Sequence, residues 1–273
     1  MAYSLLRECG YLENETYPLS RGNMVRVSAI SYLNTTPFVY GLKQKALAAH
    51  IELGFATPAV AAHQLQHHLC DLALVPVAAI PALPYYKVIG SHCIGAVSAV
   101  ASVLLCSATP VEQIRKVALD QESLTSVLLA KILLRDYWQI TPYYVPLSTP
   151  FSPPSLQRLP PYGAESVVLI GDKALLHGGE YPYVYDLAEH WILWTGKPFV
   201  FALWVANKVL PTDFTNLFDD ALAYGLAHID EAIASEVGER FPPDMAKAYL
   251  TKNISFTLDQ EKIEGLQLFW SFC

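Results

Sequence analysis

The chain has 273 residues, of which 53% are hydrophobic and 16% are charged. This composition supports a sizeable core and excludes an intrinsically disordered chain, and the length suits two domains of ordinary size. The formal net charge is -7 and no long basic run occurs, so nucleic acid is not expected as a partner. An acidic chain that binds an anion must do so with a local site.

Cysteine usage and the apolar runs indicate a cytoplasmic protein. The five cysteines are widely spaced and no Cys-x-x-Cys pair occurs, which favours reduced thiols over a disulfide framework or a zinc cluster. Residues 1–23 lack the pattern of a signal peptide, and we expect them to form a peripheral extension. No apolar run is long enough to span a membrane. We therefore expect no membrane contact. We also expect the protein to be a monomer or a homodimer.

The first part of the chain alternates strands and helices, which predicts a small parallel sheet. Strands are predicted at residues 25–30, 51–56 and 71–77, and helices at residues 37–49 and 58–70. Residues 87–105 read as extended, and the tail at residues 100–105 is long enough to cross to a second lobe.

The rest of the chain predicts a second α/β half and a helical C-terminal part. Strands are predicted at residues 116–119, 143–147, 166–170 and 198–206, and helices at residues 110–112, 124–138, 184–195, 214–228, 231–239, 243–250 and 258–272. Residues 148–162 carry five prolines and are expected to form a loop.

Two α/β halves joined by two crossings describe an α/β type II periplasmic-binding-protein-like fold, with two lobes, a central cleft and a double-stranded hinge. The expected first lobe is discontinuous and comprises residues 24–103 and 205–273, and residues 104–204 form the second lobe. In such folds the ligand binds in the cleft, which closes by hinge motion.

Polar residues follow the first predicted strand. Asn34, Thr35 and Thr36 precede a predicted helix with Pro37 in its first turn. Free backbone N–H groups at such a turn favour an anion, and the Asn34 amide can both donate and accept hydrogen bonds. An Asx-turn or a helix cap is the purely structural alternative.

A second polar group opens the helix predicted at residues 124–138. Ser123, Thr125 and Ser126 follow a strand, and their hydroxyls with free N–H groups would form a second anion cradle. A capping serine alone is the competing interpretation. Ser102 lies on the crossing segment as a candidate ligand contact, and Asp172 follows a buried strand as a base or a cap.

The sequence offers few signs of a cofactor or a metal site. His63 and His67 have the i, i+4 spacing of a metal pair, but a third ligand is not evident. The chain lacks a P-loop, a GxGxxG after a strand and a GxSxG elbow. We therefore expect neither a cofactor nor a bound metal.

Seven ordered blocks resemble the chorismate dehydratases of the futalosine route to menaquinone. These blocks are SYLNTTPF (31–38), DLALVPVAAIP (71–81), GAVSAVASVLL (95–105), ALDQESLTSVLLAKILL (118–134), LIGDKAL (169–175), YDLAEHW (185–191) and TGKPFVFALW (195–204). The related dihydroxynaphthoate synthases share the fold but open on a different turn, so SYLN favours the dehydratase.

The resemblance implies that chorismate loses water to give 3-[(1-carboxyvinyl)oxy]benzoate without a cofactor. It implies that Asn34 orients the ring hydroxyl or the base, and that Ser102 contacts the substrate. Ser123, Thr125 and Ser126 would then hold a carboxylate. The base is either the enolpyruvyl carboxylate of the substrate or Asp172. A solute-binding protein and the sister synthase are the alternative functions.

Overall fold

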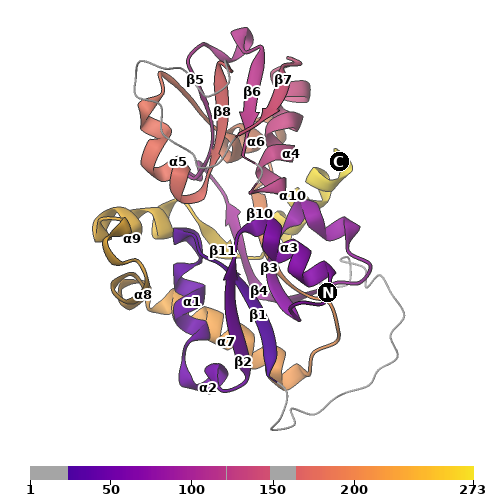
Figure 1. Cartoon of the computed structure of the whole chain (residues 1–273), viewed down its shortest axis with the longest axis vertical. Coiled ribbons are helices and arrows are strands. Elements are labelled where there is room, and N and C mark those ends of the chain that lie inside the picture. The colour runs from indigo at the N-terminus through magenta and orange to yellow at the C-terminus, as the bar shows by residue number, and fades with distance from the viewer. Residues whose placement is uncertain (1–23, 121, 148–163) are drawn as a thin grey trace. The chain divides into compact units, whose positions relative to one another are not determined.

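The computed structural model describes residues 24–120, 122–147 and 164–273, and the chain folds into two compact units (Figure 1). Among the described residues, the first unit combines those up to Gly95 with Val200–Gln260, and the second combines those of Ala96–Phe199 with Glu261–Cys273. The expected extension at residues 1–23 and the expected loop at residues 148–162 lie outside the described residues.

The first unit contains a six-stranded sheet in the order β11-β4-β10-β3-β1-β2. Its strands are β1 (Val25–Ile30), β2 (Ile51–Ala56), β3 (Leu72–Pro76), β4 (Lys87–Ala96), β10 (Phe199–Ala206) and β11 (Ser255–Thr257). Strand β1 is parallel to both β2 and β3, which confirms the predicted parallel sheet. Strand β10 runs antiparallel to β3, and β11 runs antiparallel to β4. The sequence interpretation missed β11, which has only three residues.

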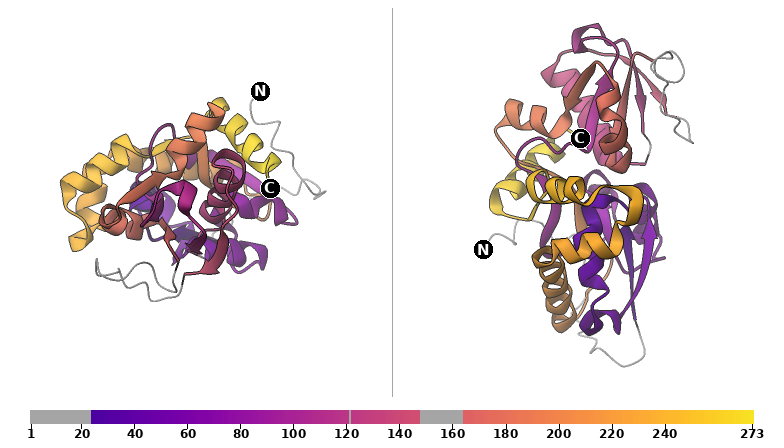
Figure 2. Two further views of the ribbon diagram at one scale, coloured as in Figure 1. Left: turned by 90° about the horizontal axis from the view of Figure 1, so that it is seen from above. Right: turned by 90° about the vertical axis from the view of Figure 1, so that its left-hand side faces the viewer.

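Several α-helices of the described chain accompany this sheet. They are α1 (Thr36–Leu42), α2 (Lys45–Ala48), α3 (Pro58–Gln66), α7 (Thr212–Ala227), α8 (Ile229–Glu236) and α9 (Pro243–Lys252). Short 3₁₀ turns lie at η2 (Leu33–Thr35), η3 (Val77–Ala82) and η8 (Gly238–Arg240). Helices α1 and α7 lie side by side (Figure 1, Figure 2). Gly41 and Gly225 allow this contact. A Cβ on Gly41 would lie 1.9 Å from the Ala221 carbonyl oxygen.

We expect Gly225→Ala to destabilise the protein by about 3 kcal/mol, since overpacking of this kind typically costs about 1–3 kcal/mol. Its added Cβ would lie 1.8 Å from the carbonyl oxygen of Pro37, which is backbone and cannot rotate away. Gly179→Ala is the matched control, because nothing lies within 4 Å of its added Cβ. Urea unfolding monitored by circular dichroism would measure both variants. Equal midpoints would contradict the close helix contact.

The second unit contains a five-stranded sheet in the order β7-β6-β8-β5-β9. Its strands are β5 (Val103–Ser107), β6 (Lys116–Leu119), β7 (Tyr143–Pro146), β8 (Ser166–Ile170) and β9 (Tyr183–Asp186). Strand β6 is parallel to β7 and β8, whereas β5 is antiparallel to β8 and β9. The prediction of helix at residues 184–186 was wrong, because tyrosine and valine favour a strand there and Asp186 ends it by capping the next helix.

The helices of the second unit include α4 (Leu124–Ile132), α5 (Gly171–His177) and α6 (Leu187–Thr195). A π-helical turn, η5 (Leu133–Tyr137), continues α4, so the long helix predicted at residues 124–138 is confirmed in extent. Shorter 3₁₀ turns lie at η4 (Val111–Gln113) and η7 (Gly178–Glu180). In the parts of the chain that the structure describes, no helix is both long and apolar enough to cross a membrane.

The C-terminal helix α10 (Gln260–Ser271) was expected in the first lobe, but nearly all of it belongs to the second unit. Aromatic side chains explain the difference. The ring of Trp191 on α6 lies 6.1 Å from that of Phe269 and 6.0 Å from that of Phe272, in edge-to-face contacts. Such pairs stabilise a core beyond their buried area. The units also divide at residues 95/96 and 199/200, eight and five residues before the expected boundaries at 103/104 and 204/205.

Candidate functional site

The turn after β1 is held by its own threonine. The Thr35 hydroxyl lies within hydrogen-bond reach of the Tyr32 carbonyl oxygen at 2.8 Å, and of the Ile30 carbonyl oxygen. Thr35 and Thr36 are both buried. The Thr35 side chain does not cap α1. Its hydroxyl therefore stabilises the change of direction from strand to helix, and with it the position of Asn34.

Asn34 lies in the middle of the 3₁₀ turn η2 and does not cap a helix. Its side-chain oxygen is buried and has no hydrogen-bond partner among the described residues. The structure therefore rules out the Asx-turn and the helix cap that the sequence left open. A buried amide oxygen without a partner is costly and calls for an explanation, such as a bound ligand.

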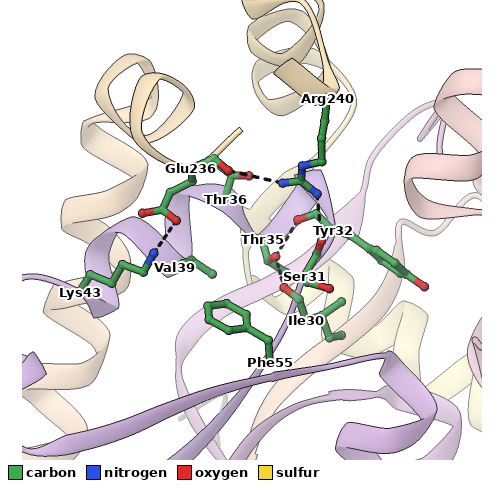
Figure 3. A pocket seen from close by; sticks show the side chains of 10 residues that line it. All are labelled: Ile30, Ser31, Tyr32, Thr35, Thr36, Val39, Lys43, Phe55, Glu236 and Arg240. Atoms are coloured by element: carbon green, nitrogen blue, oxygen red, sulfur yellow. Dashed lines mark hydrogen bonds and ion pairs between the residues drawn. The ribbon is translucent and has the colours of Figure 1, made fainter. Parts of the chain in front are cut away.

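A pocket of about 320 Å³ lies beside this turn (Figure 3). Ser31 and Tyr32, which follow β1, form one wall, and β2 contributes the ring of Phe55. The ammonium of Lys43 pairs with the carboxylate of Glu236 at 2.6 Å on another wall. Arg240 completes the pocket, and the sequence interpretation missed it. A lone arginine in a C-terminal helical region carries no motif that would reveal it.

The remaining candidate residues meet at one edge of the second sheet. Ser123 follows the carboxyl end of β6, and Asp172 follows the carboxyl end of β8. Ser102 precedes β5, which runs the other way, and Val103 pairs with Ile170. The carboxyl edge of parallel strands is where open α/β sheets bind ligands. The structure thus brings these residues together within the second unit.

Ser123 is the N-cap of α4, as the structural alternative proposed. Its Oγ accepts a hydrogen bond from the backbone N–H of Ser126 at 3.3 Å and lies 2.9 Å from the Ser126 hydroxyl. Ser123, Thr125 and Ser126 are all buried. The two serine hydroxyls therefore form a connected pair at a helix N-terminus, where the helix dipole favours negative charge. Capping by Ser123 does not prevent the pair from donating to a ligand.

A buried carboxylate holds the turn that carries Ser102. One oxygen of Asp186 accepts from the Ala101 N–H at 2.7 Å, and the other accepts from the N–H groups of Ala188 and Glu189 at 3.0 and 3.1 Å. Ala101 adopts a left-handed backbone with φ of 61°, which is unfavourable without such support. Burial raises the pKa of Asp186, although the backbone N–H donors oppose this rise.

A second charged group ties the serine turn to α5. The Lys173 ammonium lies 2.9 Å from carboxylate oxygens of both Asp120 and Glu122. Burial by itself lowers the pKa of Lys173, but these two carboxylates raise it above its ordinary value. Asp172, half-buried, is its direct neighbour at the start of α5. The ion pairs hold the loop before Ser123 against the helix that begins at Gly171.

We expect Asp186→Asn to lower the free energy of unfolding by about 2 kcal/mol, because an amide NH₂ would face a backbone N–H where a carboxylate oxygen now accepts. Asp230→Asn is the control, since Asp230 is 65% exposed in a surface ion pair with Lys247 and should change stability by less than about 0.5 kcal/mol. Denaturant titration of both variants measures the difference. Equal stability of the two variants would refute the role given to Asp186.

His63 and His67 do not form a metal cluster in the described structure. Their rings stack 4.0 Å apart, and Nδ1 of His67 lies 2.9 Å from the His63 carbonyl oxygen. No group of three or more potential metal ligands is present among the described residues.

Comparison with known proteins adds a family and a fold. The family model described as "Menaquinone biosynthesis" matches residues 25–273. A solved protein from Archaeoglobus fulgidus superposes with a TM-score of 0.72 at 13% identity, covering 93% of this chain and 97% of its own.

Two further solved structures define the fold. A Candida albicans protein described as having the generic periplasmic binding protein fold gives a TM-score of 0.60 at 14% identity, covering 91% and 90% of the two chains. The ligand-binding component of an ABC-type import system from Staphylococcus aureus gives 0.61 at 11% identity, covering 92% and 90%. These likenesses confirm the α/β type II periplasmic-binding-protein-like fold with two mixed sheets.

Proposed function

Because the chain belongs to the menaquinone biosynthesis family, we propose that it catalyses the dehydration of chorismate to 3-[(1-carboxyvinyl)oxy]benzoate, the first step of the futalosine route to menaquinone. The observation that carries the proposal is Asn34. It lies in the SYLN turn that favours the dehydratase over the sister synthase, and its buried amide oxygen lacks a partner among the described residues.

The reaction removes one proton and one hydroxide from the ring. A base takes the C3 proton, the electrons of the C3–H bond form a ring double bond, and the C4–O bond breaks. The departing hydroxide and the proton together make water. Because the ring becomes aromatic, most of the driving force comes from the substrate, and the enzyme mainly has to orient the reacting groups.

Each candidate residue has a role in this proposal. Asn34 orients the leaving hydroxyl or the base, and Ser102 contacts the substrate. The hydroxyls of Ser123, Thr125 and Ser126 receive a carboxylate, which the N-terminus of α4 stabilises. Thr35 and Thr36 support substrate binding from the turn that holds Asn34. The substrate's own enolpyruvyl carboxylate is the proposed base, and Asp172 is its rival.

Proton NMR of chorismate mixed with the purified protein tests the reaction. We expect new aromatic signals while the vinyl signals persist, since dehydration aromatises the ring and leaves the enolpyruvyl group intact. Chorismate that binds but stays unchanged would contradict the proposal and favour a solute-binding protein. Chorismate that neither binds nor reacts would favour the dihydroxynaphthoate synthase, whose substrate is different.

Two variants identify the base. We expect Asn34→Ala to lower kcat at least about 100-fold, because loss of one oriented hydrogen bond in a transition state costs about 2.7–4 kcal/mol. Asp172→Asn should keep near-normal turnover if the substrate carboxylate is the base. Asn216→Ala on the exposed face of α7 is the control for an asparagine substitution. Loss of activity in Asp172→Asn with retention in Asn34→Ala would reverse the assignment.

A further inference from the structure

The hydroxyl pair of Ser123 and Ser126 holds a proton that the described residues do not use. The two hydroxyl oxygens lie 2.9 Å apart, so one hydroxyl donates to the other. The remaining hydroxyl proton has no acceptor in the part of the chain that the structure describes. Both side chains are buried, and a buried donor without a partner is costly. An acceptor oxygen from outside the chain, such as that of a carboxylate, would satisfy this proton.

Two carboxylates lie just before this hydroxyl pair. Asp120 directly follows β6, is buried, and accepts a hydrogen bond from the Glu122 backbone N–H at 3.1 Å through one oxygen. Its other oxygen and a carboxylate oxygen of Glu122 each accept from the Lys173 ammonium at 2.9 Å. Glu122 is the residue next to Ser123. A ligand carboxylate at the hydroxyl pair would therefore be repelled by the chain unless these two charges are paired.

Lys173 supplies the positive charge for both carboxylates from a neighbouring element. It belongs to α5, which begins where β8 ends, and β8 is parallel to β6 (Figure 1). The two carboxylates raise the pKa of Lys173, so its ammonium is charged at neutral pH. Asp120 is buried and Lys173 is only partly exposed, so solvent screens these charges incompletely. The charge of Lys173 therefore acts at the place where the hydroxyl pair would meet an anion.

We propose that Lys173 is a positioning residue for an organic carboxylate that binds the Ser123 and Ser126 hydroxyls. Its ammonium holds the two carboxylates before Ser123 and compensates their charge, so that the spare hydroxyl proton can be donated to the ligand. The identification of that ligand with chorismate rests on the proposed dehydratase function. In the competing explanation the ion pairs are a structural tie alone, and the charge of Lys173 has no effect on the ligand.

A benzoate titration of the full chain, followed by the backbone amide NMR signals of residues 123–126, tests this proposal without turnover. We expect these signals to shift in the wild type, and the Kd to rise about tenfold in Lys173→Gln, whose amide keeps two donors but loses the charge. The double variant Lys173→Gln/Glu122→Gln should return the Kd to within about threefold of the wild type. It removes a carboxylate that the single variant leaves unpaired, and it restores the net charge of -7. A structural tie predicts no such rescue.

Lys247→Gln is the control, because Lys247 pairs with Asp230 and its loss removes the same charge from the other unit. Wild-type signals that do not shift, an unchanged Kd in Lys173→Gln, or a double variant that stays weak would each overturn the proposal. If Lys173→Gln does not fold, Glu122→Gln keeps the test open. It removes one negative charge and keeps the ammonium, so benzoate should bind about threefold more tightly. Equal or weaker binding in that variant would also overturn the proposal.

Chorismate kinetics in the same variants separate this proposal from the dehydratase. Turnover with a KM about tenfold higher in Lys173→Gln, little change in kcat, and recovery in the double variant would support both. Turnover with an unchanged KM and an unchanged benzoate affinity would overturn the role of Lys173 alone. Benzoate binding that depends on Lys173, without any chorismate turnover, would refute only the dehydratase.

Discussion

The second unit depends on the buried carboxylate of Asp186. This one side chain ends β9, caps α6 and accepts a hydrogen bond from Ala101, whose left-handed backbone turns the chain into β5. A buried charge is costly, and here several backbone N–H donors stabilise it, among them those of Ala101, Ala188 and Glu189. Without the carboxylate, the turn would carry both an orphaned N–H group and an unfavourable φ. The position of Ser102, the next residue, follows from that arrangement.

The two units use the same principle to gather polar groups. In the first, β1 ends directly before the turn that carries Asn34. In the second, β6 and β8 end before Ser123 and Asp172, and the antiparallel β5 starts at the same edge. Peptide groups at strand ends and helix starts are not consumed by the sheet, so hydroxyls and amides there remain able to meet a ligand. Topology, more than any single motif, therefore selects these residues.

The strands and helices with strong patterns could be predicted, whereas short or context-dependent features could not. Residues 25–30 and 166–170 form the expected strands because most of their side chains are buried in the sheet. The place of α10 depends on its tertiary partner Trp191, which no local pattern reveals, and the four-residue strand β9 depends on pairing with β5. The same holds for Arg240, which is separated from Ser31 by 209 residues and reaches the turn only in the folded chain. Long-range contacts of this kind leave no periodic signal in the sequence.

A chain that is acidic overall is proposed to bind a substrate with two carboxylates, and the charge distribution accounts for this. At the second sheet the carboxylates of Asp120 and Glu122 are occupied by Lys173, and at the first pocket Glu236 is occupied by Lys43. Each of these three carboxylates is thus neutralised by a lysine, and the serine hydroxyls and the Asn34 amide are proposed to face the ligand. Neutral donors bind a carboxylate without supplying a strong base. That combination suits a reaction in which the substrate provides its own base and its own driving force.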